Sequence, residues 1–167
     1  MKTFTLNRLS NDFYLDHPYN LFPEIEQKKD RPYIVLLIKI ENYNFALPLR
    51  TNIKHNYCYK FSKTGRETLS ATGVDFTKAV VIDKLNYIGE ETSIDDKEYL
   101  ELSKKYYFII GKFKKYLDGY IDYMKNGGNE FVVKKYQFCT LKYFNKQLGL
   151  WFYKRLEKIF SKKATKY

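Results

Sequence analysis

Residues 33–40 read Tyr33-Ile34-Val35-Leu36-Leu37-Ile38-Lys39-Ile40, a nearly continuous apolar run that is typical of a strand buried on both faces. A turn is predicted at Glu41 and Asn42, and residues 43–48 then alternate between polar and apolar side chains, as a hairpin partner does. Pro48 is expected to end this second strand, because proline has no N–H group to donate to a sheet. The stretch therefore predicts an antiparallel hairpin whose first strand is buried.

Three further strands are predicted on either side of this hairpin, at residues 1–6, 57–61 and 76–85. The last of them contains a run of four buried residues, Ala79-Val80-Val81-Ile82. Residues 7–30 are polar and broken by prolines, which predicts a loop with one helical turn near residues 9–14.

Helices dominate the C-terminal part of the sequence. Apolar residues recur there at steps of three and four, at Tyr99, Leu102, Tyr106, Ile109, Phe113, Tyr116, Tyr120 and Met124. Ser93 is the predicted N-cap of this long helix, and Gly127-Gly128 ends it. Further helices are predicted to begin at Cys139 or Thr140 and at Trp151.

Strands that precede helices favour an α+β fold. The length of 167 residues fits one domain, with a sheet-rich part at 1–90 and a helical, basic part at 93–167.

The positive charge is concentrated in the last third of the chain. The formal net charge is +11, yet residues 1–103 carry 14 basic and 15 acidic side chains, and residues 104–167 carry 16 basic and 4 acidic ones. Lysines alternate there with tyrosine and phenylalanine, and these side chains can contact phosphates and stack on bases. Nucleic acid is therefore the first expected partner, and an anionic membrane surface is the second.

Several classes of protein are excluded by composition. Two Cys and two His do not suffice for a disulfide framework or a Cys/His zinc site. No apolar run approaches the length of a membrane span, and the N-terminus lacks the pattern of a signal peptide. A cytoplasmic protein without a metal or another cofactor is the resulting expectation.

The loop that follows Pro48 carries the densest set of reactive groups. It reads Leu49-Arg50-Thr51-Asn52-Ile53-Lys54-His55-Asn56, with hydroxyl, guanidinium, ammonium and imidazole groups close together. Cleavage of RNA by its own 2′-hydroxyl needs a base, an acid and cations for the phosphorane, and this loop has candidates for each. On spacing alone, an ordinary polar loop is the more common explanation, since loops are commonly polar.

An ordered series of motifs resembles the ToxN/AbiQ family of endoribonuclease toxins from type III toxin–antitoxin systems. Arg31-Pro32-Tyr33 enters a strand, Phe45-Ala46-Leu47-Pro48-Leu49 closes the hairpin, and a hydroxyl residue and a lysine follow. Gly73-Val74-Asp75-Phe76-Thr77-Lys78, a Tyr-rich helix and Phe138-Cys139-Thr140-Leu141 come later, so that the resemblance covers residues 1 to about 150.

The resemblance implies a compact, strongly bent antiparallel sheet with flanking helices, similar to the Kid/MazF fold. It also implies metal-independent cleavage of cellular or phage RNA to 2′,3′-cyclic phosphate and 5′-hydroxyl ends, as part of abortive phage infection. An RNA antitoxin of folded tandem repeats, which the toxin itself processes, would inhibit the enzyme, and toxin and RNA could close into RNA-bridged assemblies.

The resemblance assigns roles to individual residues. The active-site hydroxyl falls on Thr51, where family members usually have Ser, and the lysine that follows matches Lys54 with one residue of slippage. Arg31 matches the basic residue before the buried strand, and its guanidinium can hold a phosphate bidentately. His55 is a candidate base from its chemistry alone, because imidazole transfers protons near neutral pH. The predicted RNA contacts are Arg50, Tyr14, Lys112, Lys115, Lys134 and Lys135.

Two other interpretations of the sequence stay open. A non-catalytic RNA- or DNA-binding module needs only the basic third of the chain, with the loop serving to hold a phosphate. A peripheral membrane protein ranks last, because aromatic residues at helical spacing more often form a core than an insertion face.

Overall fold

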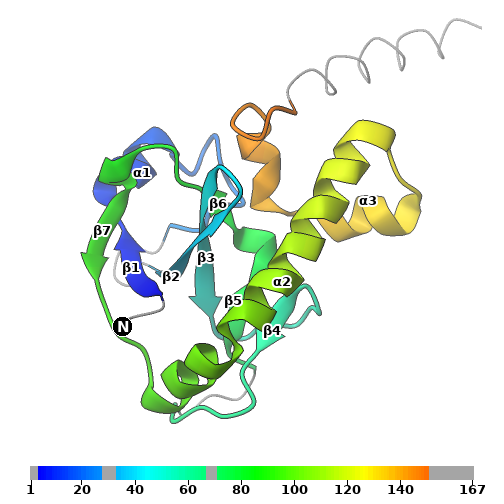
Figure 1. Cartoon of the computed structure of the whole chain (residues 1–167). Coiled ribbons are helices and arrows are strands. Elements are labelled where there is room, and N and C mark those ends of the chain that lie inside the picture. The colour runs from blue at the N-terminus through cyan, green and yellow to red at the C-terminus, as the bar shows by residue number, and fades with distance from the viewer. Residues whose placement is uncertain (1–3, 28–32, 67–70, 151–167) are drawn as a thin grey trace, which may run out of the picture.

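The computed structural model describes residues 4–27, 33–66 and 71–150. In this part of the chain, the fold consists of a sheet of seven antiparallel strands and three α-helices (Figure 1). The order in the sheet is β4 (Cys58–Lys60), β5 (Gly73–Asp75), β3 (Tyr43–Arg50), β2 (Ile34–Ile40), β1 (Thr5–Leu9) and β7 (Ile88–Glu91), and β6 (Val80–Val81) also pairs with β3. The α+β class predicted from the sequence is confirmed.

The predicted hairpin forms the centre of the sheet. Its register runs from Ile40 opposite Tyr43 to Val35 opposite Pro48. β3 nevertheless continues past Pro48 to Arg50, so the expected end of the strand is wrong. The two-residue turn makes Ile40 and Tyr43 a hydrogen-bonded pair. Because hydrogen-bonded and non-hydrogen-bonded pairs alternate along an antiparallel ladder, Val35 and Pro48 form a non-hydrogen-bonded pair, and the nitrogen of Pro48 points away from β2. On that outer side β3 pairs with β6 before Pro48 and with β5 after it, so proline breaks no ladder.

Other strand boundaries differ from the prediction. Most of the segment at 76–85 is buried, from Phe76 to Ile82, as expected, whereas residues 83–85 are exposed. The segment begins with a 3₁₀ helix, η1 (Phe76–Lys78), and contributes only the two-residue strand β6. The side chain of Asp75 accepts a hydrogen bond from the N–H of Thr77, which turns the chain out of β5. β5 and β7 were not predicted, because short strands paired through the tertiary fold carry little periodic signal.

The long helix α2 (Asp96–Asn126) packs against the sheet, and Figure 1 shows it running diagonally past β4 and β5. Its N-cap is Asp95, whose carboxylate accepts the N–H groups of Lys97 and Glu98, and not Ser93 as predicted. Gly127 ends the helix as expected, with a φ of 75° that favours glycine. The buried face of α2 meets the sheet through Phe113, whose ring lies 5.2 Å from that of Phe45.

Shorter helices complete the fold. α1 (Asn11–Asp16) confirms the predicted helical turn, and its Phe13 stacks on the buried ring of His17. α3 (Glu130–Tyr136) was not predicted, and the segment that follows Cys139 is the 3₁₀ helix η3 (Thr140–Phe144). The helix predicted to begin at Trp151 lies outside the described residues. No helix in the described ranges is long and apolar enough to cross a membrane.

Candidate functional site

Arg50, at the end of β3, lies between two carboxylates. Side chains alternate along a strand, so Ala46, Pro48 and Arg50 face the same side of the sheet. Arg50 Nη1 is 2.6 Å from Asp75 Oδ2, and Nη2 is 2.8 Å from Glu26 Oε1. The sequence predicted Arg50 as an RNA contact, whereas in this structure much of its guanidinium is engaged with protein groups.

Asp75 connects Arg50 to His55. The carboxylate is fully buried, and its Oδ1 accepts hydrogen bonds from the N–H and the hydroxyl of Thr77, at 2.9 and 2.7 Å. His55 Nε2 lies 3.3 Å from the same oxygen. Buried carboxylates need such partners, because an unpaired charge in the interior is costly. Arg50, Asp75, His55 and Thr77, which we call the Asp75 cluster, thus form one continuous polar network.

The contacts of His55 select one tautomer of its neutral ring. Nδ1 is the acceptor for the backbone N–H of Tyr57, at 3.2 Å. The ring proton therefore lies on Nε2, where it can be donated to Asp75. Asp75 in this way orients the imidazole and leaves the basic lone pair on Nδ1, which is the arrangement that a carboxylate–histidine pair uses in acid–base catalysis.

Thr51 and Lys54, two predicted catalytic residues of the loop, differ in their exposure to solvent. Thr51 is half-buried directly after Arg50, and Lys54 is exposed. Between them Asn52 adopts a φ of 60°, and Ile53 is buried and donates its N–H to the carbonyl of Ala71. This inward-facing residue fixes the middle of the loop, so that Thr51 and His55 lie on either side of a defined turn. Arg31 lies outside the described residues.

Among the four predicted RNA-binding lysines, Lys135 lies over the aromatic ring that stacks beside His55. Its Nζ lies over the rings of Tyr57, Tyr116 and Tyr136, at 5.3, 5.5 and 4.9 Å from their centroids. The ring of Tyr57 in turn stacks beside that of His55, with 6.1 Å between centroids. Burial lowers the pKa of Lys135, and no carboxylate among the described residues forms an ion pair with it that would oppose this shift.

The remaining predicted lysines are exposed on the helices. Lys134 is exposed and forms an ion pair with Glu130 at 2.7 Å. Lys112 lies over the ring of Phe108, 5.6 Å from its centroid, and Lys115 is exposed on α2. The structure therefore brings Lys135 to the Asp75 cluster and leaves the other three on the helical surface.

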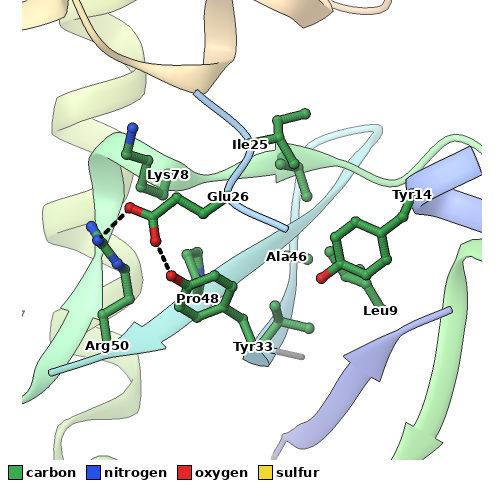
Figure 2. Close-up of a pocket in the computed structure, with 11 residues that line it drawn as sticks. Leu9, Tyr14, Ile25, Glu26, Tyr33, Ala46, Pro48, Arg50 and Lys78 are labelled. Carbon is green, nitrogen blue, oxygen red and sulfur yellow. Dashed lines mark hydrogen bonds and ion pairs between the residues drawn. The ribbon is translucent and has the colours of Figure 1, made fainter. Parts of the chain in front are cut away.

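A small pocket lies beside Arg50, on the face of β3 that also carries Ala46 and Pro48 (Figure 2). Its lining includes Tyr14, predicted to contact substrate, and Figure 2 shows the hydroxyl of Tyr14 directed into it and Glu26 linked to both Arg50 and Tyr33. Burial raises the pKa of Tyr14 to about 12. The volume of about 30 Å³ admits one or two water molecules. The pocket is thus too small for a nucleotide.

Sequence reasoning missed the role of Asp75 and Thr77. Both lie in the Gly73–Lys78 motif, but no spacing rule connects that motif to the loop at 49–56. A signal was present, because an Asp two residues before a Thr at the end of a strand is typical of a side-chain-capped turn. The sequence pattern could not predict that the second carboxylate oxygen of Asp75 pairs with Arg50 of β3.

Neither a family model, nor a curated protein, nor a solved structure matches this chain. Among the described residues, no group of three or more His, Cys, Asp and Glu side chains is arranged to hold a metal ion. The functional argument therefore depends on the geometry of the Asp75 cluster and on the distribution of charge.

Proposed function

We propose that this protein is an endoribonuclease that cleaves RNA without a metal ion, through attack of the 2′-hydroxyl on the adjacent phosphate. The observation that carries the proposal is that Asp75 holds the imidazole of His55 beside the ring of Tyr57, over which the ammonium of Lys135 lies. Thr51, a half-buried hydroxyl residue, precedes His55 by four positions in the same loop. This set offers a base, a hydroxyl donor and a cation, which are the groups that such a reaction needs.

In the proposed reaction, His55 Nδ1 accepts the proton of the 2′-hydroxyl after exchanging its contact with the N–H of Tyr57. The 2′-oxygen forms a bond to phosphorus, and the bond from phosphorus to the 5′-oxygen breaks. The products are a 2′,3′-cyclic phosphate and a 5′-hydroxyl. Thr51 and Lys54 stabilise the charge of the phosphorane, and the leaving 5′-oxygen takes its proton from Lys135, whose lowered pKa makes that transfer easier.

The proposed biological setting is a type III toxin–antitoxin system that acts in abortive phage infection. The support is the ordered series of motifs that resembles the ToxN/AbiQ family, together with the α+β fold and the net charge of +11. The finer expectations are also proposals: a Kid/MazF-like bent sheet, a cytoplasmic location, an inhibitory RNA of folded tandem repeats and an RNA-bridged assembly. Tandem repeats of a few dozen nucleotides upstream of the reading frame would support this setting.

A non-catalytic RNA- or DNA-binding module is the second candidate function. The observation that favours it is that both ring nitrogens of His55 and two guanidinium nitrogens of Arg50 already have protein partners. In that case the lysines of the C-terminal third would do all the binding, and the Asp75 cluster would only stabilise the loop.

Incubation of the purified protein with cellular RNA in EDTA separates the two candidates. The endoribonuclease produces fragments with cyclic-phosphate ends, and His55→Ala lowers their rate of formation by about a hundredfold or more. Thr51→Ala lowers the rate as well, while the matched change Thr92→Ala, on the segment that follows β7, leaves it unchanged. RNA that stays intact in EDTA, or equal rates for all variants, contradicts the proposal and leaves the binding module.

A further inference from the structure

A groove lies between the loop after β4 and the N-terminal half of α2. It has a volume of about 580 Å³, within the range of about 300 to 1,000 Å³ that is usual for ligand sites. Its lining, which shares no residue with the Asp75 cluster, consists of Tyr59, Ser62, Lys63, Lys97, Leu100, Glu101, Lys104 and Lys105. Four of these eight are lysines, so the groove is strongly positive. We call it the α2 groove.

The single carboxylate of the α2 groove is used to fix its wall. Glu101 accepts hydrogen bonds from the hydroxyl of Tyr59 at 2.7 Å, from the hydroxyl of Ser62 at 2.7 Å and from the N–H of Ser62 at 2.9 Å. In the described part of the chain, none of the four lysines of the groove forms an ion pair with a carboxylate. The loop is therefore anchored to the helix, and the ammonium groups are left for an external anion.

An exposed aromatic ring continues the groove along α2. Phe108 is 57% exposed, and its ring lies 6.2 Å from that of Tyr59 in an edge-on contact. The ammonium groups of Lys105 and Lys112 lie over this ring, at 6.0 and 5.6 Å. An exposed ring among cations suits a base that stacks while its phosphates pair with lysines.

The basic and aromatic residues of this surface share one face of α2, and that face extends from the α2 groove toward the Asp75 cluster. Lys97, Lys104, Phe108 and Lys112 recur at steps of seven, four and four, which places them on one face of α2. Tyr59 of β4 and Tyr57, which directly precedes this strand, both contact α2, through Phe108 and Tyr116 respectively. Because Tyr57 also stacks beside His55 and under Lys135, the basic face leads from the α2 groove to the Asp75 cluster.

We propose that the α2 groove binds a single-stranded segment of RNA and directs the strand toward His55. This inference deepens the proposed endoribonuclease function. Delivery of the strand to His55 rests on that function, whereas binding of RNA in the α2 groove is independent of it. A single strand fits better than a duplex, because a paired base cannot present its face to Phe108. The lysines contact successive phosphates, and Phe108 stacks on one base.

The experiment measures binding of a fluorescent, 2′-O-methylated oligouridylate by anisotropy over a range of salt concentrations. This probe cannot be cleaved by 2′-hydroxyl attack, so binding is observed apart from catalysis. Phe108→Ala is expected to weaken binding by about fivefold or more through lost stacking. Replacing Lys104 and Lys105 by alanine is expected to reduce the slope of log affinity against log salt by about 1.4. The control replaces Lys125 and Lys146, which carry the same charge elsewhere.

The possible results test RNA binding in the α2 groove separately from the proposed nuclease activity. If the Phe108 and Lys104/Lys105 variants bind like the Lys125/Lys146 control, the groove proposal is overturned, whether or not the wild type cuts RNA. If they lose binding while wild-type protein leaves unmodified RNA intact, the groove stands and the nuclease proposal fails. Equal binding of a duplex oligonucleotide contradicts the single-strand assignment. The replaced side chains are exposed, and a thermal unfolding midpoint equal to that of the wild type confirms that each variant is folded.

Discussion

Asp75 joins its own turn to the end of β3 and to the loop that follows β3. One oxygen receives Arg50 from β3, and the other receives Thr77 from the same turn and His55 from the preceding loop. The carboxylate is inaccessible to solvent, so its charge depends on these partners for compensation. Its contribution is thus both to folding and to the orientation of the imidazole.

Replacement of Asp75 tests both contributions. Asp75→Asn removes the charge that pairs with Arg50, and we expect it to lower the free energy of unfolding by about 1–3 kcal/mol, because a buried charged partner loses its acceptor. It should also reduce RNA cleavage more than it reduces RNA affinity. Urea unfolding and parallel cleavage and binding assays measure the two effects. Asp83→Asn, at an exposed position, is the control and should stay within about 0.5 kcal/mol.

Lys134 and Lys135 are neighbours in sequence with different environments. Lys135 rests on three aromatic rings beside His55, whereas the charge of Lys134 is shared with Glu130. We expect Lys135→Ala to reduce RNA cleavage strongly, by about a hundredfold if it is the acid, and Lys134→Ala to change it less than twofold. Single-turnover rates on one RNA substrate compare the two variants. Equal losses would assign Lys135 to general phosphate binding and not to the reaction.

At the scale of elements, the loop after β4 is held on α2 by acidic side chains of the helix. Glu101 binds Ser62 and Tyr59, Glu98 binds Arg66 at 2.8 Å, and Asp95 accepts the N–H of Gly65. Burial by itself raises the pKa of Glu101, but hydrogen bonds from Ser62, Tyr59 and Lys63 outweigh it and lower the pKa below the usual 4.5. The ionised carboxylate therefore stabilises the folded loop.

The sign of the resulting pH dependence follows from the lowered pKa. The contribution of Glu101 is complete above pH 4.5, its ordinary value, and is lost as the pH falls through the lower value in the folded state. We expect Glu101→Gln to be less stable than the wild type near neutral pH, with a difference that shrinks in acid. Urea unfolding at about pH 6 and about pH 3 measures this change. Glu90→Gln, on the exposed edge strand β7, should show a smaller difference at both values.

At the scale of the whole molecule, one cluster of buried side chains connects the sheet to α2. Phe113 is completely buried and packs against Phe45 of β3 and Phe76 of η1, with ring centroids 5.2 and 5.7 Å apart. The basic helical part and the sheet-rich part therefore share a core. This shared core holds the lysines of α2 in fixed positions relative to the loop that carries His55.

We expect the two parts to unfold together as one cooperative unit. Phe113→Ala should lower the free energy of unfolding by about 3–5 kcal/mol, because it leaves a cavity between helix and sheet. The helical circular dichroism and the tyrosine absorbance should then shift to the same lower urea midpoint. Phe131→Ala removes a ring that is 70% exposed and should have little effect. Separate transitions for the two probes would contradict a single domain.

Much of the secondary structure followed from local patterns. The hairpin at residues 33–48 and the long helix ending at Gly127 have strong periodicity and clear turn signals, and both are present in the structure. The two-residue strand β6 and the strand β7 lack such signals, because they are defined by their partners in the sheet. The helix is capped by Asp95 and not by the predicted Ser93, because these two residues are both suitable N-caps and lie only two positions apart.

The sequence by itself determined the α+β class, the central hairpin, the basic helical third and the reactive loop around Thr51 and His55. These features depend on neighbouring residues, whose side-chain pattern and charge are local properties of the chain. The tertiary structure alone decided that Asp75 is the carboxylate that orients His55 and occupies Arg50, and that Lys135, not Lys134, lies beside them. Such contacts arise because packing of the sheet against α2 and α3 brings together residues as far apart in sequence as Tyr57 and Lys135, and no local pattern encodes that proximity.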